Sequence, residues 1–153
     1  MKKMFSKMMF AFVAMSLLVT TASATWVSVQ ITPGSFAGEI GWELSDASGT
    51  VIASQPYGYY TMSGVPVDTW VNVTPDCYAM TMLDSWGDGW NGGTYQILDS
   101  NGTVYGSGGL GAGLSTATDY VGIGATCTIG CTDSTATNYD PSATFDDGSC
   151  TYG

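Results

Sequence analysis

The chain has 153 residues, with thirteen Asp and Glu, three Lys and Arg, and no His. All three basic residues lie in the first seven positions, so the rest of the chain has no positively charged side chain. This pattern excludes binding to nucleic acid or to anionic lipid surfaces, which depends on Lys and Arg. The absence of His also excludes catalysis built around an imidazole, which leaves only carboxylate chemistry.

Residues 1–24 have the pattern of a secretory signal peptide. Three lysines precede an apolar run at 8–19, and the small residues Ala22-Ser23-Ala24 follow it as a cleavage site. The alternative is a membrane anchor, but this run is shorter than the roughly 20 residues that a spanning helix needs. We therefore expect cleavage after Ala24, secretion without membrane insertion, and a mature chain with a side-chain charge of −13.

After residue 24, short apolar and β-branched runs alternate with turns rich in Gly, Asn, Asp, Ser and Pro. Eight strands are expected, at residues 26–32, 39–45, 50–54, 67–74, 77–84, 94–99, 103–107 and 117–122. Many short strands without an ordinary helix predict an all-β fold, an antiparallel β-sandwich of jelly-roll-like type. The first strand, 26–31, either pairs within its own domain or completes the sheet of a neighbouring molecule as an edge strand.

Two segments resemble each other: 42–54 and 95–107 align without gaps. Five of thirteen positions match, namely Asp46/Asp99, Gly49/Gly102, Thr50/Thr103, Val51/Val104 and Ser54/Ser107. Each segment predicts a hairpin with an Asp-x-x-Gly turn whose glycine has a positive φ. True duplication and two similar turns both explain the match.

The segment 84–93, Asp-Ser-Trp-Gly-Asp-Gly-Trp-Asn-Gly-Gly, is the first acidic motif. Asp84, Asp88 and Asn91 offer three side-chain oxygens in a glycine-rich loop, which suits the flexible oxygen coordination of calcium. Asx turns that cap backbone N–H groups are the alternative. Calcium is favoured because two carboxylates 4 Å apart repel by about 4 kcal/mol at an effective dielectric constant near 20, and no basic side chain can offset this. Of the two loop tryptophans, Trp86 and Trp90, we expect at least one to be buried.

The second acidic motif, 130–150, is bracketed by two cysteines. It contains five candidate calcium ligands: Asp133, Asn138, Asp140, Asp146 and Asp147. A segment with so few apolar residues needs a disulfide or a metal to fold, whereas a flexible acidic tail would not contain Tyr139, Pro141 and Phe145.

Four cysteines in a secreted chain predict disulfides, and four allow three connectivities. Cys131–Cys150 is favoured because these two residues bracket one compact motif. Cys77–Cys127 would then tie that motif to the main domain.

Both motifs have a familiar pattern. The Trp-Glu-Leu hairpin, the following Cys and Asp-Ser-x-Gly-Asp-Gly-Trp-Asn-Gly resemble a β-sandwich module of secreted multidomain proteins from marine and environmental microbes. The stretch Cys-Thr-Asp…Ala-Thr-Asn-Tyr-Asp-Pro…Asp-Asp-Gly-Ser-Cys resembles a short acidic repeat of similar surface proteins and, more loosely, thrombospondin type 3 calcium repeats. The resemblance implies extracellular, calcium-binding, structural or adhesive roles. It implies ligands at Asp84, Asp88 and Asn91, and at Asp133, Asn138, Asp146 and Asp147.

We therefore expect a signal peptide at 1–24, a β-sandwich domain at 25–126 and a calcium-binding motif at 127–153. The leading hypothesis is a secreted structural or adhesive module, a subunit of an extracellular filament, matrix or surface layer. Its partners would be further copies of itself or other extracellular proteins. Similar modules occur within long proteins, whereas this sequence has one copy of each motif. This difference favours a small secreted subunit that assembles.

Two other functions are weighed against this one. The first is a calcium-dependent carbohydrate-binding module that uses exposed aromatic residues of the loop 57–60 to bind glycans. The second is a carboxylate glycosidase, which needs two acids about 5–10 Å apart across a cleft. Glu39 and Glu43 are the only Glu residues and are expected at solvated positions on one face of a strand. We therefore expect no enzyme activity.

Overall fold

The computed structural model describes residues 23–153, so the predicted signal peptide lies outside the described residues except for its last two positions. The strands are β1 (Thr25–Thr32), β2 (Ile40–Ser45), β3 (Val51–Gln55), β4 (Val67–Val73), β5 (Asp76–Asp84), β6 (Thr94–Asp99), β7 (Val104–Gly108), β8 (Thr116–Ile123), β9 (Ile129–Gly130) and β10 (Phe145–Asp146). The eight predicted strands are all present, and their ends agree within one residue. The helical segment η1 (Ala37–Glu39) spans three residues, and no helix within 23–153 is long and apolar enough to cross a membrane.

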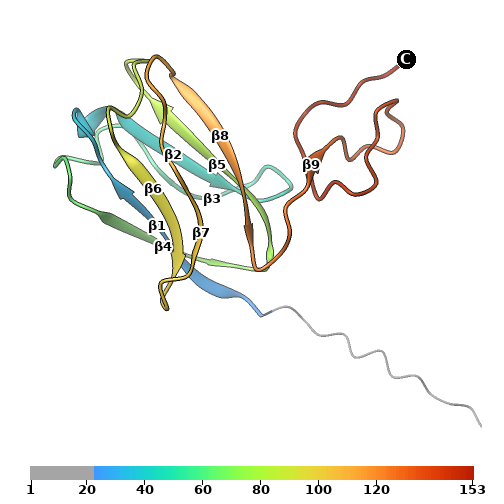
Figure 1. Ribbon diagram of the computed structural model, residues 1–153, viewed down its shortest axis with the longest axis horizontal. Helices are drawn as coiled ribbons and strands as arrows, with labels where there is room; N and C mark the ends of the chain where they lie inside the picture. Colours follow the sequence, from blue (N-terminus) through green and yellow to red (C-terminus); the bar gives the residue numbers. More distant parts are fainter. Residues whose placement is uncertain (1–22) are drawn as a thin grey trace, which may run out of the picture.

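Eight of the strands form two four-stranded antiparallel sheets that pack face to face (Figure 1). One sheet has the order β4-β1-β6-β7 and the other β3-β2-β5-β8. The core between them comes from alternate residues, for example Val27, Val29 and Ile31 of β1, which are fully buried. The β-sandwich predicted from the sequence is confirmed.

The two halves of the sandwich, β1–β4 and β5–β8, have the same topology. Each strand of the first half corresponds to the strand four places later in the chain. If corresponding strands are exchanged, the order of one sheet becomes the order of the other. The pairing of β1 with β4 aligns Ser28 with Trp70, and the pairing of β5 with β8 aligns Ala79 with Tyr120 at the corresponding place. The internal similarity in sequence thus has a structural counterpart that extends beyond the two hairpins.

The hairpins β2–β3 and β6–β7 share one turn geometry. Asp46 Oδ1 accepts hydrogen bonds from the backbone N–H groups of Ser48 and Thr50. Asp99 Oδ1 does the same with Asn101 and Thr103. The turn glycines, Gly49 and Gly102, both have a φ of 83°, as the Asp-x-x-Gly pattern predicts.

The strand β1 lies inside its sheet, between β4 and β6. Both of its backbone edges are occupied within the chain by antiparallel pairing. The hypothesis that this strand completes a neighbour's sheet is therefore wrong for this fold, because β1 has no free edge.

The C-terminal motif packs against the outer face of the sheet that contains β5 and β8 (Figure 1). The ring of Phe145 lies 5.0 Å from that of Tyr120, edge to face, and next to Ala79. Disulfides join Cys77 to Cys127 and Cys131 to Cys150, which confirms the predicted connectivity. The first disulfide anchors the motif to β5, and the second closes the motif on itself.

Candidate functional site

Three carboxylates converge at the end of the sandwich where the chain crosses between sheets. Glu39, Asp84 and Asp88 each offer one oxygen, and these oxygens lie within 4.8 Å of one another. Within residues 23–153 this is the one group of three or more acidic, Cys or His side chains placed closely enough to share a metal ion. The cluster can hold a metal ion.

Strand pairing brings Glu39 and Asp84 together. Asp84 is the last residue of β5 and is the register partner of Ile40, the first residue of β2. One residue beyond the ladder, the N–H of Ser85 donates to the carbonyl of Glu39 at 3.1 Å. The end of η1 and the end of β5 are therefore fixed to each other through the backbone.

Asp84 organises the β5–β6 loop around one carboxylate oxygen. Its Oδ2 accepts hydrogen bonds from the backbone N–H groups of Gly87, Asp88 and Gly89, at 2.6, 2.9 and 3.2 Å. The turn requires glycine at Gly89, since its φ is 92° and a Cβ there would overlap the carbonyl oxygen of Gly111. The loop thus places the Asp88 side chain beside the Asp84 carboxylate, which accepts the hydrogen bonds of the loop backbone.

The other oxygen of Asp84 has no partner among the described residues. Asp84 is 3% exposed, and both its Oδ1 and the Oε2 of Glu39 are buried without a hydrogen bond. Buried polar atoms are normally paired, so these two unpaired carboxylate oxygens are candidate metal ligands. The pKa of Glu39 is raised, first by burial of its carboxylate and then by the negative charges of Asp88 and Asp84.

Neighbouring loops hold the cluster from the side. The N–H of Ser35 in the β1–β2 loop donates to the carbonyl of Asn91. The N–H of Gly113 in the β7–β8 loop donates to the carbonyl of Asp88. The indole of Trp90 is fully buried and donates to the carbonyl of Leu83, which confirms that one loop tryptophan is buried, whereas Trp86 is 79% exposed.

The structure combines two of the predicted ligands with one that the sequence reasoning missed. Asp84 and Asp88 are in the cluster, but the Asn91 amide donates its N–H to Asp88 Oδ1 and to the Gly89 carbonyl, so it orients Asp88. The prediction that Glu39 is a solvated strand residue is wrong, because η1 turns it towards Asp84 before β2 begins. The pairing of β2 with β5 was the signal that could have found it.

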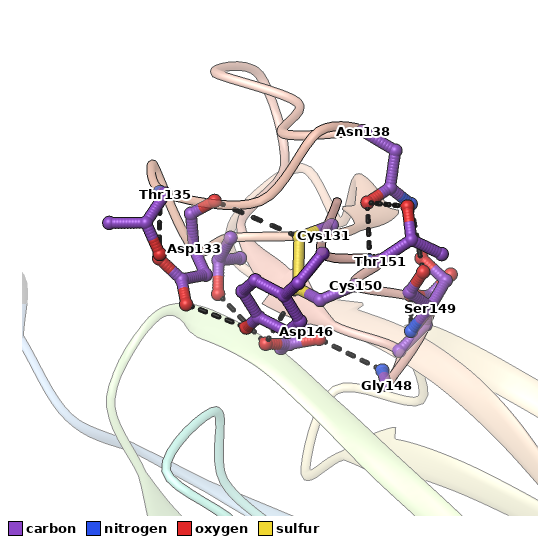
Figure 2. Close-up of a disulfide and its surroundings, with 12 residues drawn as sticks. Cys131, Asp133, Thr135, Asn138, Asp146, Gly148, Ser149, Cys150 and Thr151 are labelled. Atoms are coloured by element: carbon purple, nitrogen blue, oxygen red, sulfur yellow. Dashed lines mark hydrogen bonds between the residues drawn. A yellow bond between two sulfur atoms is a disulfide. The ribbon is translucent and has the colours of Figure 1, made fainter.

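The acidic residues of the C-terminal motif each bind atoms of nearby residues. Asp133 Oδ1 accepts from the N–H of Thr135, Asp140 Oδ1 from Ser142, Asp146 Oδ1 from Gly148 and Asp147 Oδ1 from Ser149. Asn138 Oδ1 accepts from the N–H of Thr151 (Figure 2). Figure 2 shows Asp133 and Asn138 on opposite sides of the Cys131–Cys150 disulfide. Within residues 127–153, no three acidic side chains lie as close to one another as those of Glu39, Asp84 and Asp88.

The aromatic loop 57–60 is partly structural. Tyr60 is buried and accepts a hydrogen bond from the Trp42 indole at 2.7 Å. This burial raises the pKa of Tyr60 to about 12. Tyr57 lies over Gly41, where an added Cβ would come within 3.1 Å of its ring. Tyr57 and Tyr59 remain half exposed.

The fold and the site together define a β-sandwich with an acidic cluster at one end and a disulfide-closed motif on one face. Comparison with protein-family models, with curated proteins and with solved structures gives no match to this chain. The functional inference therefore depends on the sequence and the structure of this chain. Its two disulfides indicate an oxidising, extracellular environment.

Proposed function

We propose that the protein is a secreted, calcium-stabilised structural or adhesive module, a subunit of an extracellular filament, matrix or surface layer. One observation carries the calcium assignment: two buried carboxylate oxygens, Asp84 Oδ1 and Glu39 Oε2, lie in a three-acid cluster without a hydrogen-bond partner among the described residues. Residues 23–153 contain no Lys, Arg or His that could neutralise them. A bound cation would balance the cluster while all three carboxylates stay charged.

The chemistry of the donors favours calcium over other metals. All three side chains offer carboxylate oxygens, whereas zinc prefers nitrogen and sulfur donors. Calcium accepts six to eight oxygens in a flexible geometry, and a loop built on positive-φ residues suits it better than the strict octahedron of magnesium. Glu39, Asp84 and Asp88 would hold the ion.

The ion would act as a structural tie between the two halves of the sandwich. Glu39 belongs to the crossing from β1 to β2, whereas Asp84 ends β5 and Asp88 lies in the crossing from β5 to β6. An ion between them links the equivalent loops of the two halves. We assign no catalytic role to the cluster, because Asp84 is almost fully buried and one of its oxygens already accepts three backbone hydrogen bonds.

The extracellular role is supported by the disulfides and by the surface charge. An acidic surface without basic residues self-repels unless cations are present, so calcium would also favour association between copies. Strand addition would use one of the edge strands β3, β4, β7 or β8, since β1 is internal. Electron microscopy of the secreted protein with calcium should show assemblies. Monomers alone at high concentration in calcium would contradict the assembly role.

The calcium role is tested with Glu39→Gln, which removes one negative charge and one ligand. In calcium this variant should be less stable than wild type. In chelator it should be more stable, because it relieves repulsion and the burial of a charge. Glu43→Gln is the matched control, since Glu43 is the other Glu of the chain and lies in β2 outside the cluster. Equal effects of Glu39→Gln with and without calcium, measured by urea unfolding, would contradict the assignment.

A further inference from the structure

The outer face of the sheet β4-β1-β6-β7 carries two exposed tryptophans. Trp26 of β1 is 58% exposed and Trp70 of β4 is 49% exposed. Trp26 pairs with Asn72, and Trp70 pairs with Ser28, so the two indoles are diagonal neighbours on adjacent strands. Diagonal neighbours of this kind lie about 7–8 Å apart at the backbone, within reach of one extended ligand.

The burial of Ser28 indicates that neighbouring side chains of the outer face cover it. Ser28, which is two residues from Trp26 and pairs with Trp70, is 1% exposed although, within residues 23–153, the other sheet packs on the opposite face. The side chains around it must therefore cover it, and its register neighbours are Trp70 and Leu98. A ring with one face on the sheet and the other in solvent is about half exposed, as both tryptophans are.

A row of polar side chains runs across the sheet beside the tryptophans. The register aligns Asp68, Gln30, Gln96 and Ser107 on four successive strands. Asp68 Oδ1 accepts hydrogen bonds from Ser28 Oγ at 2.6 Å and from Gln30 Nε2 at 3.1 Å, which fixes this end of the row. The amides of Gln30 and Gln96 provide both donors and acceptors, the combination that pairs with hydroxyl groups.

The equivalent surface of the other sheet is covered. There Cys77, Ala79 and Tyr120 occupy the positions that correspond to Trp26, Ser28 and Trp70, and Phe145 of the C-terminal motif packs on them. The same location on the sheet β4-β1-β6-β7 has larger aromatic side chains and is open to solvent. Two exposed tryptophans beside each other on an uncovered sheet face are typical of an interaction site.

Charge decides which ligand fits. Asp68 borders the patch, and residues 23–153 have no basic side chain, so acidic ligands, including the acidic C-terminal motif of another copy, are repelled. An uncharged ligand with flat apolar faces and hydroxyl edges meets no repulsion. Its faces match the two indoles and its hydroxyls match the polar row.

We propose that the outer face of the sheet β4-β1-β6-β7 binds a neutral polysaccharide, whose sugar rings stack on Trp26 and Trp70 while their hydroxyls pair with Asp68, Gln30 and Gln96. This site is distinct from the acidic cluster and from the aromatic loop 57–60. It gives the module a means of attachment to a glycan surface.

The test uses protein made in a host that does not add N-linked sugars, because Asn72 opposite Trp26 is in an Asn-Val-Thr sequon. Binding to cellulose, chitin and β-1,3-glucan is measured by sedimentation, with alginate as the acidic comparison. Binding to at least one neutral polymer, and none to alginate, is expected. Trp26→Ala and Trp70→Ala should each weaken this binding at least tenfold. The matched control is Trp86→Ala, at an exposed tryptophan outside this face, which should bind like wild type.

Binding to none of the neutral polymers would overturn the proposal, as would binding that survives Trp26→Ala combined with Trp70→Ala. Analytical ultracentrifugation of the same variants tests the competing occupant: self-association lost with the two tryptophans would assign the face to a second copy and overturn the glycan site. Circular dichroism should show that the variants are folded, since both indoles are exposed. Glu39→Gln should bind the polymer like wild type, so failure of the calcium site and failure of this site are separable.

Discussion

The two aspartate-rich regions of the chain differ in whether their acidic side chains meet one another. In the β5–β6 loop, Asp84 and Asp88 meet Glu39 from another loop, and buried oxygens are left without partners. In the C-terminal motif, Asp133, Asp140, Asp146 and Asp147 each accept a backbone N–H two residues ahead. Aspartate density alone does not distinguish the two arrangements.

The difference lies in what surrounds each carboxylate. A strand end that meets a crossing loop brings together acids far apart in sequence, whereas an exposed turn lets each acid bind its own backbone. The first arrangement concentrates negative charge that a counter-ion would offset. In the second, each carboxylate has a backbone partner, and the Cys131–Cys150 disulfide closes the motif.

Of the substitutions considered, we expect the largest loss of stability at Asp84. Asp84→Ala removes a proposed ligand and the acceptor of three backbone hydrogen bonds, so it should destabilise the protein by about 4 kcal/mol in saturating calcium. Asp147→Ala, which removes one exposed turn acceptor, should have a much smaller effect, whether or not calcium is present. Urea unfolding in calcium and in chelator measures both values. A calcium-dependent loss at Asp147 would assign a metal ion to the C-terminal motif as well.

Loss of the second disulfide should affect the C-terminal motif and leave the cluster intact. The double variant Cys131→Ser/Cys150→Ser opens a loop with a sequence separation of 19, which is worth about 3 kcal/mol. Hydrogen exchange should show lost protection in residues 127–153 and unchanged protection in the β5–β6 loop. Recovery of protection in the motif on addition of calcium would contradict the division between the two regions.

Calcium should stabilise the wild-type protein by about 2.7 kcal/mol at a concentration one hundred times its dissociation constant. For a domain of this size, that corresponds to a rise in melting temperature of about 10 °C. Calorimetry in calcium and in chelator measures the shift. A melting temperature that is the same in both would remove the basis for a structural ion.

The smallest effects are expected at the paired hairpin turns. Asp46→Ala and Asp99→Ala should each lower the free energy of unfolding slightly, because each removes the acceptor of two backbone hydrogen bonds. The pKa of Asp46 is lowered mainly by the hydroxyl of Ser48, and that of Asp99 mainly by the N–H of Thr103. A lowered pKa stabilises the fold above the unfolded value near 3.8, and this contribution is lost as pH falls through the folded value. Acid titration of stability should therefore be shallower in both variants below about pH 4, and a curve of unchanged slope would contradict this.

Local patterns predicted much of this fold. The eight strands, the Asp-x-x-Gly turns and both disulfides follow from alternation, turn chemistry and cysteine spacing, all of which act over short stretches or in a closed motif. The partner of Asp84 could not be predicted in the same way, because Glu39 approaches it through the pairing of β2 with β5. The internal position of β1 also depends on strands distant in sequence, which is why an edge position was considered for it.

Calcium titration by isothermal calorimetry tests the central claim most directly, with wild type, Glu39→Gln and the control Glu43→Gln compared at neutral pH. Wild type and Glu43→Gln should bind calcium with the same affinity, and Glu39→Gln should bind at least tenfold more weakly. Absence of binding by wild type, or equal affinity in all three proteins, would contradict the claim that the converging carboxylates hold an ion.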